Sequence, residues 1–382
     1  VSVMSEETKK APAIRFQGFT DDWEQRELKE ILKVNSGRDY KHLGSGSIPV
    51  YGTGGYMLSV NDKLSDKDAI GIGRKGTIDK PQYLKAPFWT VDTLFFMIPL
   101  NNFDLQFLYT MTQKINWKKM DESTGVPSLS KAVIEKVNQN IPSYQEQIKI
   151  GGFFKQLDNT IALHQQKQRQ IRSLKQGFIK NLFPNNKNSA PRIRFSIFND
   201  DWNQRNASEI FTSVSDKNYP ELPVLSASQE KGMVLRESNG IDIKYDQKST
   251  GTYKRVLPGQ FVMHLRSFQG GFAYSTIEGI TSPAYTILAF RNKEDHYPLF
   301  WKSIFSSKNF IKRLEAITYG IRDGRSISYA DFSTLRFWIP SYEEQKQIGD
   351  FIESIDATIA FYQRQIDMMQ SLKKELLNKM FI

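Results

Sequence analysis

Two long stretches of the chain, residues 143–182 and 341–382, carry apolar residues at spacings that alternate between four and three. The seam positions are Ile150, Phe154, Leu157 and Ile161 in the first stretch and Ile348, Ile352, Ile355 and Ile359 in the second. A heptad seam that lasts about four heptads in both stretches predicts two long helices that pair as a coiled coil. His164, Gln168 and Lys175 interrupt the first seam, so they either weaken the pairing or fix its register.

Both predicted helices begin with the same start signal. Ser143 and Glu146 form a Ser-x-x-Glu capping box, and Ser341 and Glu344 repeat it, so we expect each Glu to reach back to the cap N–H. At a rise of about 1.5 Å per residue, residues 143–182 would span about 60 Å. We therefore expect two rods of equal length that pair antiparallel, with one module at each end.

The chain consists of two copies of one framework. Residues 14–26 and 193–205 match at 9 of 13 positions, and residues 141–163 and 339–361 match at 13 of 23. The segments between them, 32–124 and 211–322, do not resemble each other. Drift alone would blur the framework as much as these bodies, so the pattern favours two modules that recognise two different targets.

Both bodies have the mixture of short apolar runs and Gly-rich turns that predicts strands and loops, with strands expected near residues 48–51, 69–73, 88–98, 225–228 and 280–290. Arg, Lys, Gln and Ser on loop tips can reach base edges and phosphates. The residues predicted to contact DNA are Arg38, Tyr51, Arg74, Lys75, Ser128, Lys131, His264, Arg266, Gln269, Arg322, Arg325 and Ser326.

The charge balance points to a polyanionic partner. Lys and Arg number 52 against 41 Asp and Glu, a formal net charge of +11, which favours nucleic acid before an acidic membrane. The chain has no cysteine, which excludes disulfides, thiol nucleophiles and Cys-ligated zinc. It has only four His, which makes a metal site built from His unfavourable. No apolar run suggests a membrane span, and residues 1–10 lack a signal-peptide core, so we expect a cytoplasmic protein.

Four motifs in the observed order carry a family resemblance. They are the repeated Phe-x-x-Phe-x-x-x-Trp (Phe16, Phe19, Trp23; Phe195, Phe198, Trp202), Ile-Gly-Arg-Lys-Gly-Thr-Ile at 72–78, Ser-Thr-Gly-Val-Pro-Ser-Leu-Ser-Lys at 123–131, and Ile-Pro-Ser-Tyr-Gln-Glu-Gln at 141–147. With them the whole chain resembles the specificity subunit of a type I restriction–modification system.

The resemblance implies an α+β fold: two mixed α/β target-recognition domains separated by two long antiparallel coiled-coil helices, with an internal pseudo-two-fold repeat. The expected boundaries are 1–142 for the first domain, 143–183 for the first helix, 184–191 for a linker, 192–340 for the second domain and 341–382 for the second helix. Each domain would read one half of a bipartite asymmetric DNA site. The helices would set the gap and form a docking surface through the seam positions.

The same resemblance implies the partners and a role in host defence against foreign DNA. They are double-stranded DNA, two methyltransferase subunits and two restriction/translocase subunits, with no membrane. The chain itself would be non-catalytic and bind no cofactor or metal. S-adenosylmethionine, ATP and Mg²⁺ would be held by the partner subunits.

Three other classes remain open from the residues alone. An adenine methyltransferase with built-in recognition segments needs a Pro-Pro motif, and the chain has no Pro-Pro. A metal-dependent nuclease needs clustered carboxylates, whereas Asp21-Asp22 and Asp200-Asp201 sit in the repeated framework and are expected to cap or orient a helix. A non-enzymatic RNA-binding adaptor is the third alternative. No Gly-Lys dipeptide occurs, so a P-loop is excluded.

Overall fold

The computed structural model describes residues 11–184, 189–228, 231–239, 247–318 and 327–382. The chain forms two compact units. Unit 1 comprises Val1–Gln166 and Gln363–Ile382, and unit 2 comprises Lys167–Tyr362. Each unit therefore contains one body and segments of both long helices.

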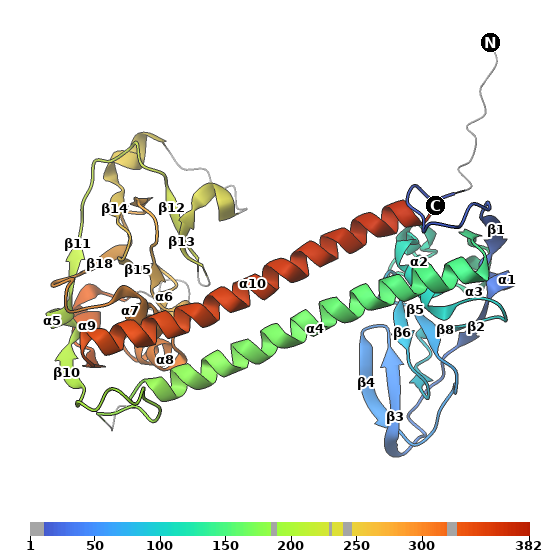
Figure 1. The fold of residues 1–382 in the computed structure, drawn as a ribbon, viewed down its shortest axis with the longest axis horizontal. Helices are drawn as coiled ribbons and strands as arrows, with labels where there is room; N and C mark the ends of the chain where they lie inside the picture. The colour runs from blue at the N-terminus through green and yellow to red at the C-terminus, as the bar shows by residue number, and fades with distance from the viewer. Residues whose placement is uncertain (1–10, 185–188, 229–230, 240–246, 319–326) are drawn as a thin grey trace, which may run out of the picture. The chain divides into compact units, whose positions relative to one another are not determined.

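Unit 1 is built on a four-stranded antiparallel sheet of order β2-β8-β5-β6 (Figure 1). The strands are β2 (Leu32–Ser36), β8 (Leu94–Pro99), β5 (Ala69–Gly73) and β6 (Gln82–Leu84). All five residues of β5 are buried, as an apolar run in the middle of a sheet requires. The main core includes residues from this sheet and from α2 (Leu105–Lys114), and α4 (Tyr144–Leu182) contributes Ile150 and Phe154.

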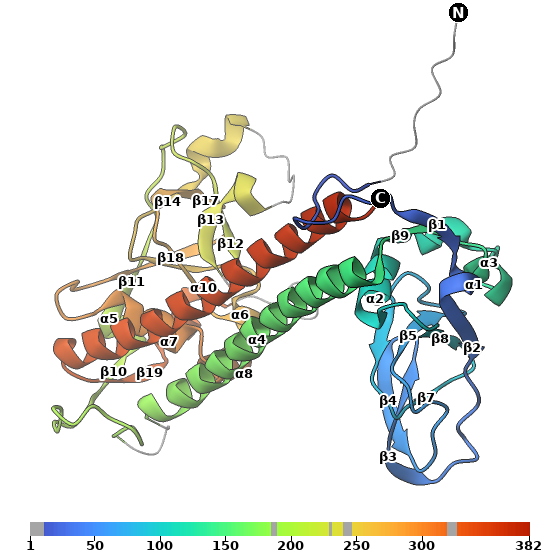
Figure 2. The same cartoon turned by 45° about the vertical axis from the view of Figure 1, so that its right-hand side comes forward.

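A smaller sheet of order β4-β3-β7 extends unit 1 beside the main sheet (Figure 2). Its strands are β3 (Ser45–Gly52), β4 (Gly55–Val60) and β7 (Trp89–Thr90), and they enclose a separate apolar cluster around Phe88 and Trp89. The remaining elements are the two-stranded ribbon β1 (Glu24–Glu27) with β9 (Asn138–Ile141), and the short helices α1 (Leu28–Ile31), η1 (Trp117–Met120) and α3 (Lys131–Glu135).

Unit 2 has a four-stranded antiparallel sheet of order β11-β18-β15-β16. Its strands are β11 (Phe211–Val214), β18 (Thr286–Phe290), β15 (Phe261–Met263) and β16 (Ala273–Tyr274). The other pairs are β10 (Asn203–Asn206) with β19 (Arg336–Ile339), β12 (Leu225–Ser228) with β13 (Gly232–Leu235), and β14 (Lys254–Val256) with β17 (Gly279–Thr281). The helices of unit 2's body are α5 (Ala207–Ile210), η2 (Arg236–Asn239), η3 (Gln247–Thr252), α6 (Ser267–Gly270), α7 (Pro298–Phe305), α8 (Lys308–Ala316) and α9 (Tyr329–Ser333).

The two bodies share one sheet topology although their sequences do not match. In unit 1, β2 follows the short helix α1 and pairs with β8, which pairs with β5. In unit 2, β11 follows the short helix α5 and pairs with β18, which pairs with β15. Consequently the β5–β6 connection of unit 1 and the β15–β16 connection of unit 2 occupy equivalent places.

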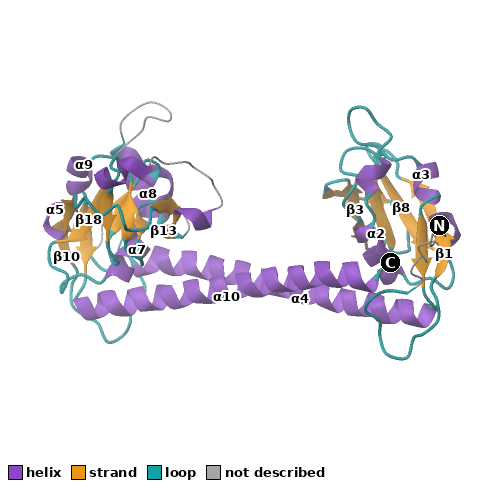
Figure 3. Ribbon diagram, turned by 90° about the horizontal axis from the view of Figure 1, so that it is seen from above, coloured by secondary structure: helices purple, strands orange, loops and turns teal. Residues whose placement is uncertain are grey.

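The two long helices confirm the predicted helical stretches. α4 and α10 (Tyr342–Met380) are each continuous over 39 residues (Figure 3). In unit 1, Phe154 and Asp158 of α4 contact Phe381 and Lys373 respectively, so the partner numbers fall as α4 advances. In unit 2, Lys175 and Phe178 contact Asp356 and Phe351 in the same falling order. The pairing within each unit is therefore antiparallel, as predicted.

The capping-box prediction is only half right. Ser143 Oγ accepts the backbone N–H of Glu146 at 3.4 Å, as a cap should. The Glu146 side chain instead forms a bidentate ion pair with Arg15, at 2.7 Å from both Nε and Nη2. Glu344 pairs in the same way with Arg194, at 2.8 and 2.7 Å. Each Glu carboxylate thus fastens the repeated opening segment to the start of a long helix.

Three further expectations need correction. The predicted strand at 88–98 is two strands, β7 and β8, which belong to different sheets. The predicted strand at 280–290 is likewise two strands, β17 and β18, in different sheets. Asp21 and Asp22 cap no helix, because the next element is strand β1; their charges help to raise the pKa of Arg15, after the dominant hydrogen bond to Glu146. Asp200 contributes its backbone O, which accepts from Arg194 Nη2 at 2.6 Å. None of the helices in the described ranges combines the length and apolar character of a membrane span.

Candidate nucleic-acid interface

The β5–β6 connection of unit 1 presents Arg74 and Lys75 on an exposed tip. The backbone N–H of Arg74 donates to Thr93 O at 2.8 Å, which anchors the tip to the sheet. The Arg74 guanidinium lies 5.9 Å from the centre of the Phe95 ring. Both cationic side chains therefore stand on a tip whose backbone is fixed.

A second loop, residues 121–130, pairs with this tip. Gly76 N–H donates to Pro127 O at 2.8 Å, and Leu129 N–H donates to Arg74 O at 2.9 Å. Lys75 and Ser128 form an antiparallel bridge. Ser130 then caps α3 by accepting the N–H of Val133 at 3.2 Å. These backbone hydrogen bonds hold the 121–130 loop against the β5–β6 connection.

An open pocket of about 800 Å³ lies between these loops. It is lined by Ser36, Arg74, Lys75, Phe95, Glu122, Ser123, Thr124, Gly125, Val126, Ser128, Leu129, Ser130 and Lys131. Three cations and one carboxylate line it, so its net charge is positive. Four predicted DNA-contacting residues, Arg74, Lys75, Ser128 and Lys131, thus meet in one place.

The remaining predictions for unit 1 lie outside this pocket. Arg38 is exposed in the loop after β2, and its backbone O accepts Trp89 Nε1–H at 2.9 Å. Tyr51 is half-buried in β3 and packs against the apolar cluster of the smaller sheet. The β3–β4 turn does approach the basic tip, because Thr53 Oγ1 would lie 3.7 Å from a Cβ on Gly76.

In unit 2, the equivalent β15–β16 connection carries three predicted residues. Arg266 and Gln269 are exposed, and His264 is partly buried. The Arg266 backbone N–H donates to His264 Nδ1 at 3.2 Å, and the His264 N–H donates to Ser267 Oγ at 2.8 Å. Burial lowers the pKa of His264, so this ring serves as a neutral acceptor that shapes the tip. Arg322, Arg325 and Ser326 lie outside the described residues.

The side chains at the predicted seam positions are buried or half-buried. Ile150, Phe154, Ile161, Ile348, Ile352 and Ile359 are buried, and Leu157 and Ile355 are half-buried. Ile150 and Phe154 belong to the main core of unit 1, and Ile348 belongs to that of unit 2. The side chains of Ile150, Phe154 and Ile348 therefore hold the long helices against the bodies.

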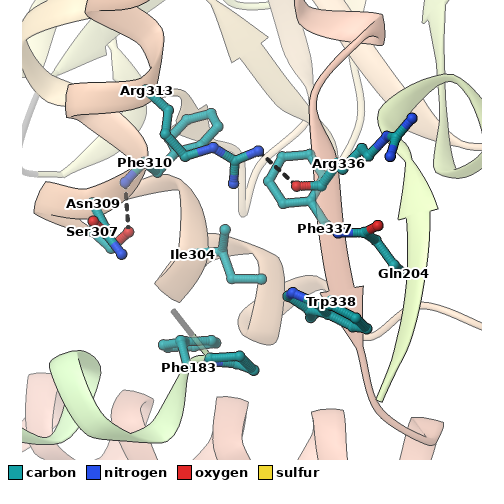
Figure 4. A pocket seen from close by; sticks show the side chains of 11 residues that line it. Phe183, Gln204, Ile304, Ser307, Asn309, Phe310, Arg313, Arg336, Phe337 and Trp338 are labelled. Carbon is teal, nitrogen blue, oxygen red and sulfur yellow. Dashed lines mark hydrogen bonds between the residues drawn. The ribbon is translucent and has the colours of Figure 1, made fainter. Parts of the chain in front are cut away.

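Unit 2 also contains a smaller pocket of about 270 Å³ beside the β10–β19 ribbon (Figure 4). Phe183, Phe337 and Trp338 supply aromatic walls. Arg313 Nη2 donates to Arg336 O at 2.6 Å, and burial lowers the pKa of Arg313. None of the predicted DNA-contacting residues in the described ranges lines this pocket.

Sequence reasoning missed Asp121, which shapes the 121–130 loop. Its carboxylate accepts bonds from the backbone and hydroxyl of Ser123 and from the backbone of Ser128, and these bonds hold the pKa of Asp121 below its ordinary value. The Asp-x-Ser spacing is a recognised turn signal that could have identified it.

Two comparisons with known sequences agree on a family. A protein-family model described as the type I restriction modification DNA specificity domain matches residues 20–173. The type I restriction enzyme MjaVIII specificity subunit of Methanocaldococcus jannaschii is 22% identical over 298 residues, covering 72% of this chain and 68% of that protein. Residues 20–173 therefore match the type I restriction modification DNA specificity domain, and most of the chain is similar to a type I specificity subunit.

Solved structures of very different sequence have the same fold. A crystal structure of a type I restriction–modification S subunit from M. genitalium aligns with a TM-score of 0.66 at 14% identity, covering 97% of this chain and 99% of that one. A chain from a structure describing complex assembly and conformational transition of a type I R-M system aligns with a TM-score of 0.51 at 14% identity, covering 94% and 98%. These likenesses agree with the predicted α+β fold.

These similarities support a specificity subunit over the other functional classes that the residues left open. A specificity subunit is non-catalytic, and the catalytic activities lie on other subunits. The methyltransferase, nuclease and RNA-adaptor alternatives are therefore set aside. Within the part of the chain that the structure describes, no cluster of three or more His, Asp or Glu side chains is arranged to hold a metal ion.

Proposed function

We propose that this specificity subunit recognises a bipartite, asymmetric site on double-stranded DNA, with unit 1 reading one half and unit 2 the other. The observation that carries the proposal is the equivalence of two basic tips. Arg74 and Lys75 occupy the β5–β6 connection, and Arg266 and Gln269 occupy the matching β15–β16 connection. Exposed Arg, Lys and Gln are suited to base edges and phosphates, and different residues on equivalent tips suit different half-sequences.

The long helices would carry the partner contacts and set the unread gap. Exposed apolar residues recur at repeat-equivalent positions: Leu163 and Leu174 on α4 are 53% and 60% exposed, and Phe361 and Leu372 on α10 are 48% and 45% exposed. Each pair is eleven residues apart, about three helical turns, so its members share a helix face. This duplication supports docking of two methyltransferase subunits, which would hold S-adenosylmethionine. Two restriction/translocase subunits using ATP and Mg²⁺ would complete the complex.

The proposal is tested with the full chain assembled with its methyltransferase partner. A library of duplex DNA with randomised positions is methylated and sequenced, which reports both half-sites. We expect Ala at Arg74 and Lys75 to relax one half only, and Ala at Arg266 and Gln269 to relax the other. Lost base contacts should cost about 1–3 kcal/mol each.

Lys63→Ala is the matched control, because Lys63 is a unit 1 cation outside the pocket and paired with Asp66 at 2.6 Å. It should leave both halves unchanged. A wild-type complex that selects no two-part sequence would refute the proposal.

A further inference from the structure

The 121–130 loop is closed at its neck by one carboxylate. Asp121 Oδ1 accepts the Ser123 N–H at 3.0 Å, the Ser123 hydroxyl at 2.8 Å and the Ser128 N–H at 2.9 Å. The Glu122 N–H adds a bond to Ser128 O at 3.2 Å. These bonds join the two sides of the loop, so the residues between them form a closed turn.

The turn displays an apolar side chain within a basic pocket. Thr124, Gly125 and Val126 are exposed, and Val126 is 56% exposed. All three line the same pocket as Arg74 and Lys75. Cations suit phosphates and guanine edges, whereas an exposed aliphatic group suits the methyl of thymine.

Asp121 also fixes where the turn stands relative to the cations. Ser128, which Asp121 binds, is bridged to Lys75, and the neighbouring Pro127 O accepts the N–H of Gly76 at 2.8 Å. A displacement of the neck would therefore move the turn against the basic tip. The same bonds lower the pKa of Asp121, with the Ser128 N–H as the largest cause, so the charged acceptor persists into acid.

We propose that Asp121 is a positioning residue whose carboxylate holds the Thr124–Val126 turn as a base-discriminating element of unit 1. The inference rests on the proposed function, because it names the part of unit 1 that selects bases. Arg74 and Lys75 contact base edges and phosphates from the basic tip, and the turn adds an apolar contact that discriminates bases in the same half-site.

The test uses two variants of different severity in the full complex. Asp121→Ala removes all three carboxylate bonds, and Ser123→Ala removes only the hydroxyl bond. With the randomised duplex library as probe, we expect Asp121→Ala to raise acceptance of wrong bases in one half-site about tenfold, the scale of one lost base contact. Ser123→Ala should have a smaller effect at the same positions, and the other half-site should stay unchanged.

Asp66→Asn is the charge-matched control. Asp66 also lies in unit 1, outside the pocket, and pairs with Lys63 at 2.6 Å. It loses the same charge as Asp121→Ala and should leave both half-sites unchanged.

Three outcomes would contradict either the role of Asp121 or the proposed function, and the experiment distinguishes between them. A two-part wild-type profile that neither loop variant alters would overturn the role of Asp121 while leaving the proposed function intact. Equal relaxation of both halves by Asp121→Ala would also overturn it, because the residue would then act through the whole chain. A wild-type complex with no two-part profile would overturn the proposed function and this inference together.

Discussion

Gly151 shows how one residue can fix the approach of a long helix to a body. A Cβ at Gly151 would lie 2.5 Å from Asp104 Oδ1 and 2.6 Å from Phe107 N, at the start of α2. A Cβ at Gly349, the equivalent residue in the second repeat, would lie 2.7 Å from Phe300 N. A Cβ at the neighbouring Gly152 would meet no atom within 4 Å, so the close approach involves Gly151 alone of the two.

The neighbouring glycines give a matched pair of substitutions. Gly151→Ala should destabilise the chain by about 1–3 kcal/mol, because the added methyl group overlaps the backbone of α2. Gly152→Ala meets no atom within 4 Å and should stabilise by up to about 1 kcal/mol, the difference in helix propensity. Urea unfolding measures both. Similar effects from the two substitutions would contradict the packing account.

His296 gives a pH dependence that can be assigned to one ring. It is 6% exposed, its ring centroid lies 5.4 Å from that of Phe290, and burial lowers its pKa to about 4. Nearby Asp295 opposes this shift and Arg205 adds to it. The unfolded chain takes up a proton near the ordinary value of 6.5, whereas the folded chain does not until about pH 4.

Stability should therefore fall as pH decreases from about 6.5 towards 4, since the unfolded state binds the proton first. His296→Gln should flatten this part of the curve, whatever its effect at pH 7. His42→Gln, at an exposed position of unit 1, is the control and should leave the slope unchanged. Thermal unfolding at several pH values provides the measurement, and an unchanged slope in His296→Gln would refute the assignment.

At the scale of elements, the polar seam residues fix the register of the paired helices. Lys175 Nζ lies 2.6 and 2.7 Å from the two carboxylate oxygens of Asp356. Lys373 Nζ lies 2.6 Å from Asp158 Oδ1, in the equivalent place of the other repeat. Gln168 Nε2 also donates to Ile359 O at 3.3 Å. The second of the two sequence interpretations, that polar residues set the register, is thus the one that the contacts support.

A charge exchange tests this register pair. Lys175→Glu should destabilise by roughly 1–2 kcal/mol, between the values for exposed and buried pairs, because it faces Asp356. Adding Asp356→Lys should restore most of the loss, and the double-mutant cycle gives the coupling energy. Lys180→Glu, an exposed change of equal charge on α4, is the control. Additive effects at 175 and 356 would show that the pair does not stabilise the seam.

At the scale of the whole molecule, both long helices supply residues to both units. Under the proposed function, their length sets the number of unread base pairs between the half-sites. A heptad inserted into both helices keeps the seam in phase and adds about 10.5 Å. At a rise of about 3.4 Å per base pair, the gap should widen by about three base pairs.

Sequencing of the methylated library measures this gap directly. The half-sequences should not change in the lengthened chain. Replacing residues 32–124 with the same segment of a relative should do the reverse, changing one half-sequence and keeping the gap. A helix insertion that altered a half-sequence while the gap stayed constant would show that the helices do not set the spacing.

The sequence by itself determined the features that depend on local or repeated patterns. Heptad spacing predicted α4 and α10, because helix periodicity is written in consecutive residues. The two-copy framework was visible because its residues make the same contacts twice, as Arg15 with Glu146 and Arg194 with Glu344 do. Charge and loop composition indicated a nucleic-acid partner and singled out the basic tip at Arg74 and Lys75.

Only the tertiary structure decided what each element contacts. The common sheet order of the two bodies rests on strand pairs far apart in sequence, which tolerate different side chains and leave no shared motif. Whether Glu146 caps its own helix or binds Arg15 depends on a partner 131 residues away. The pocket at the basic tip likewise exists because residues 121–130 fold back onto the β5–β6 connection, a long-range pairing that no local pattern encodes.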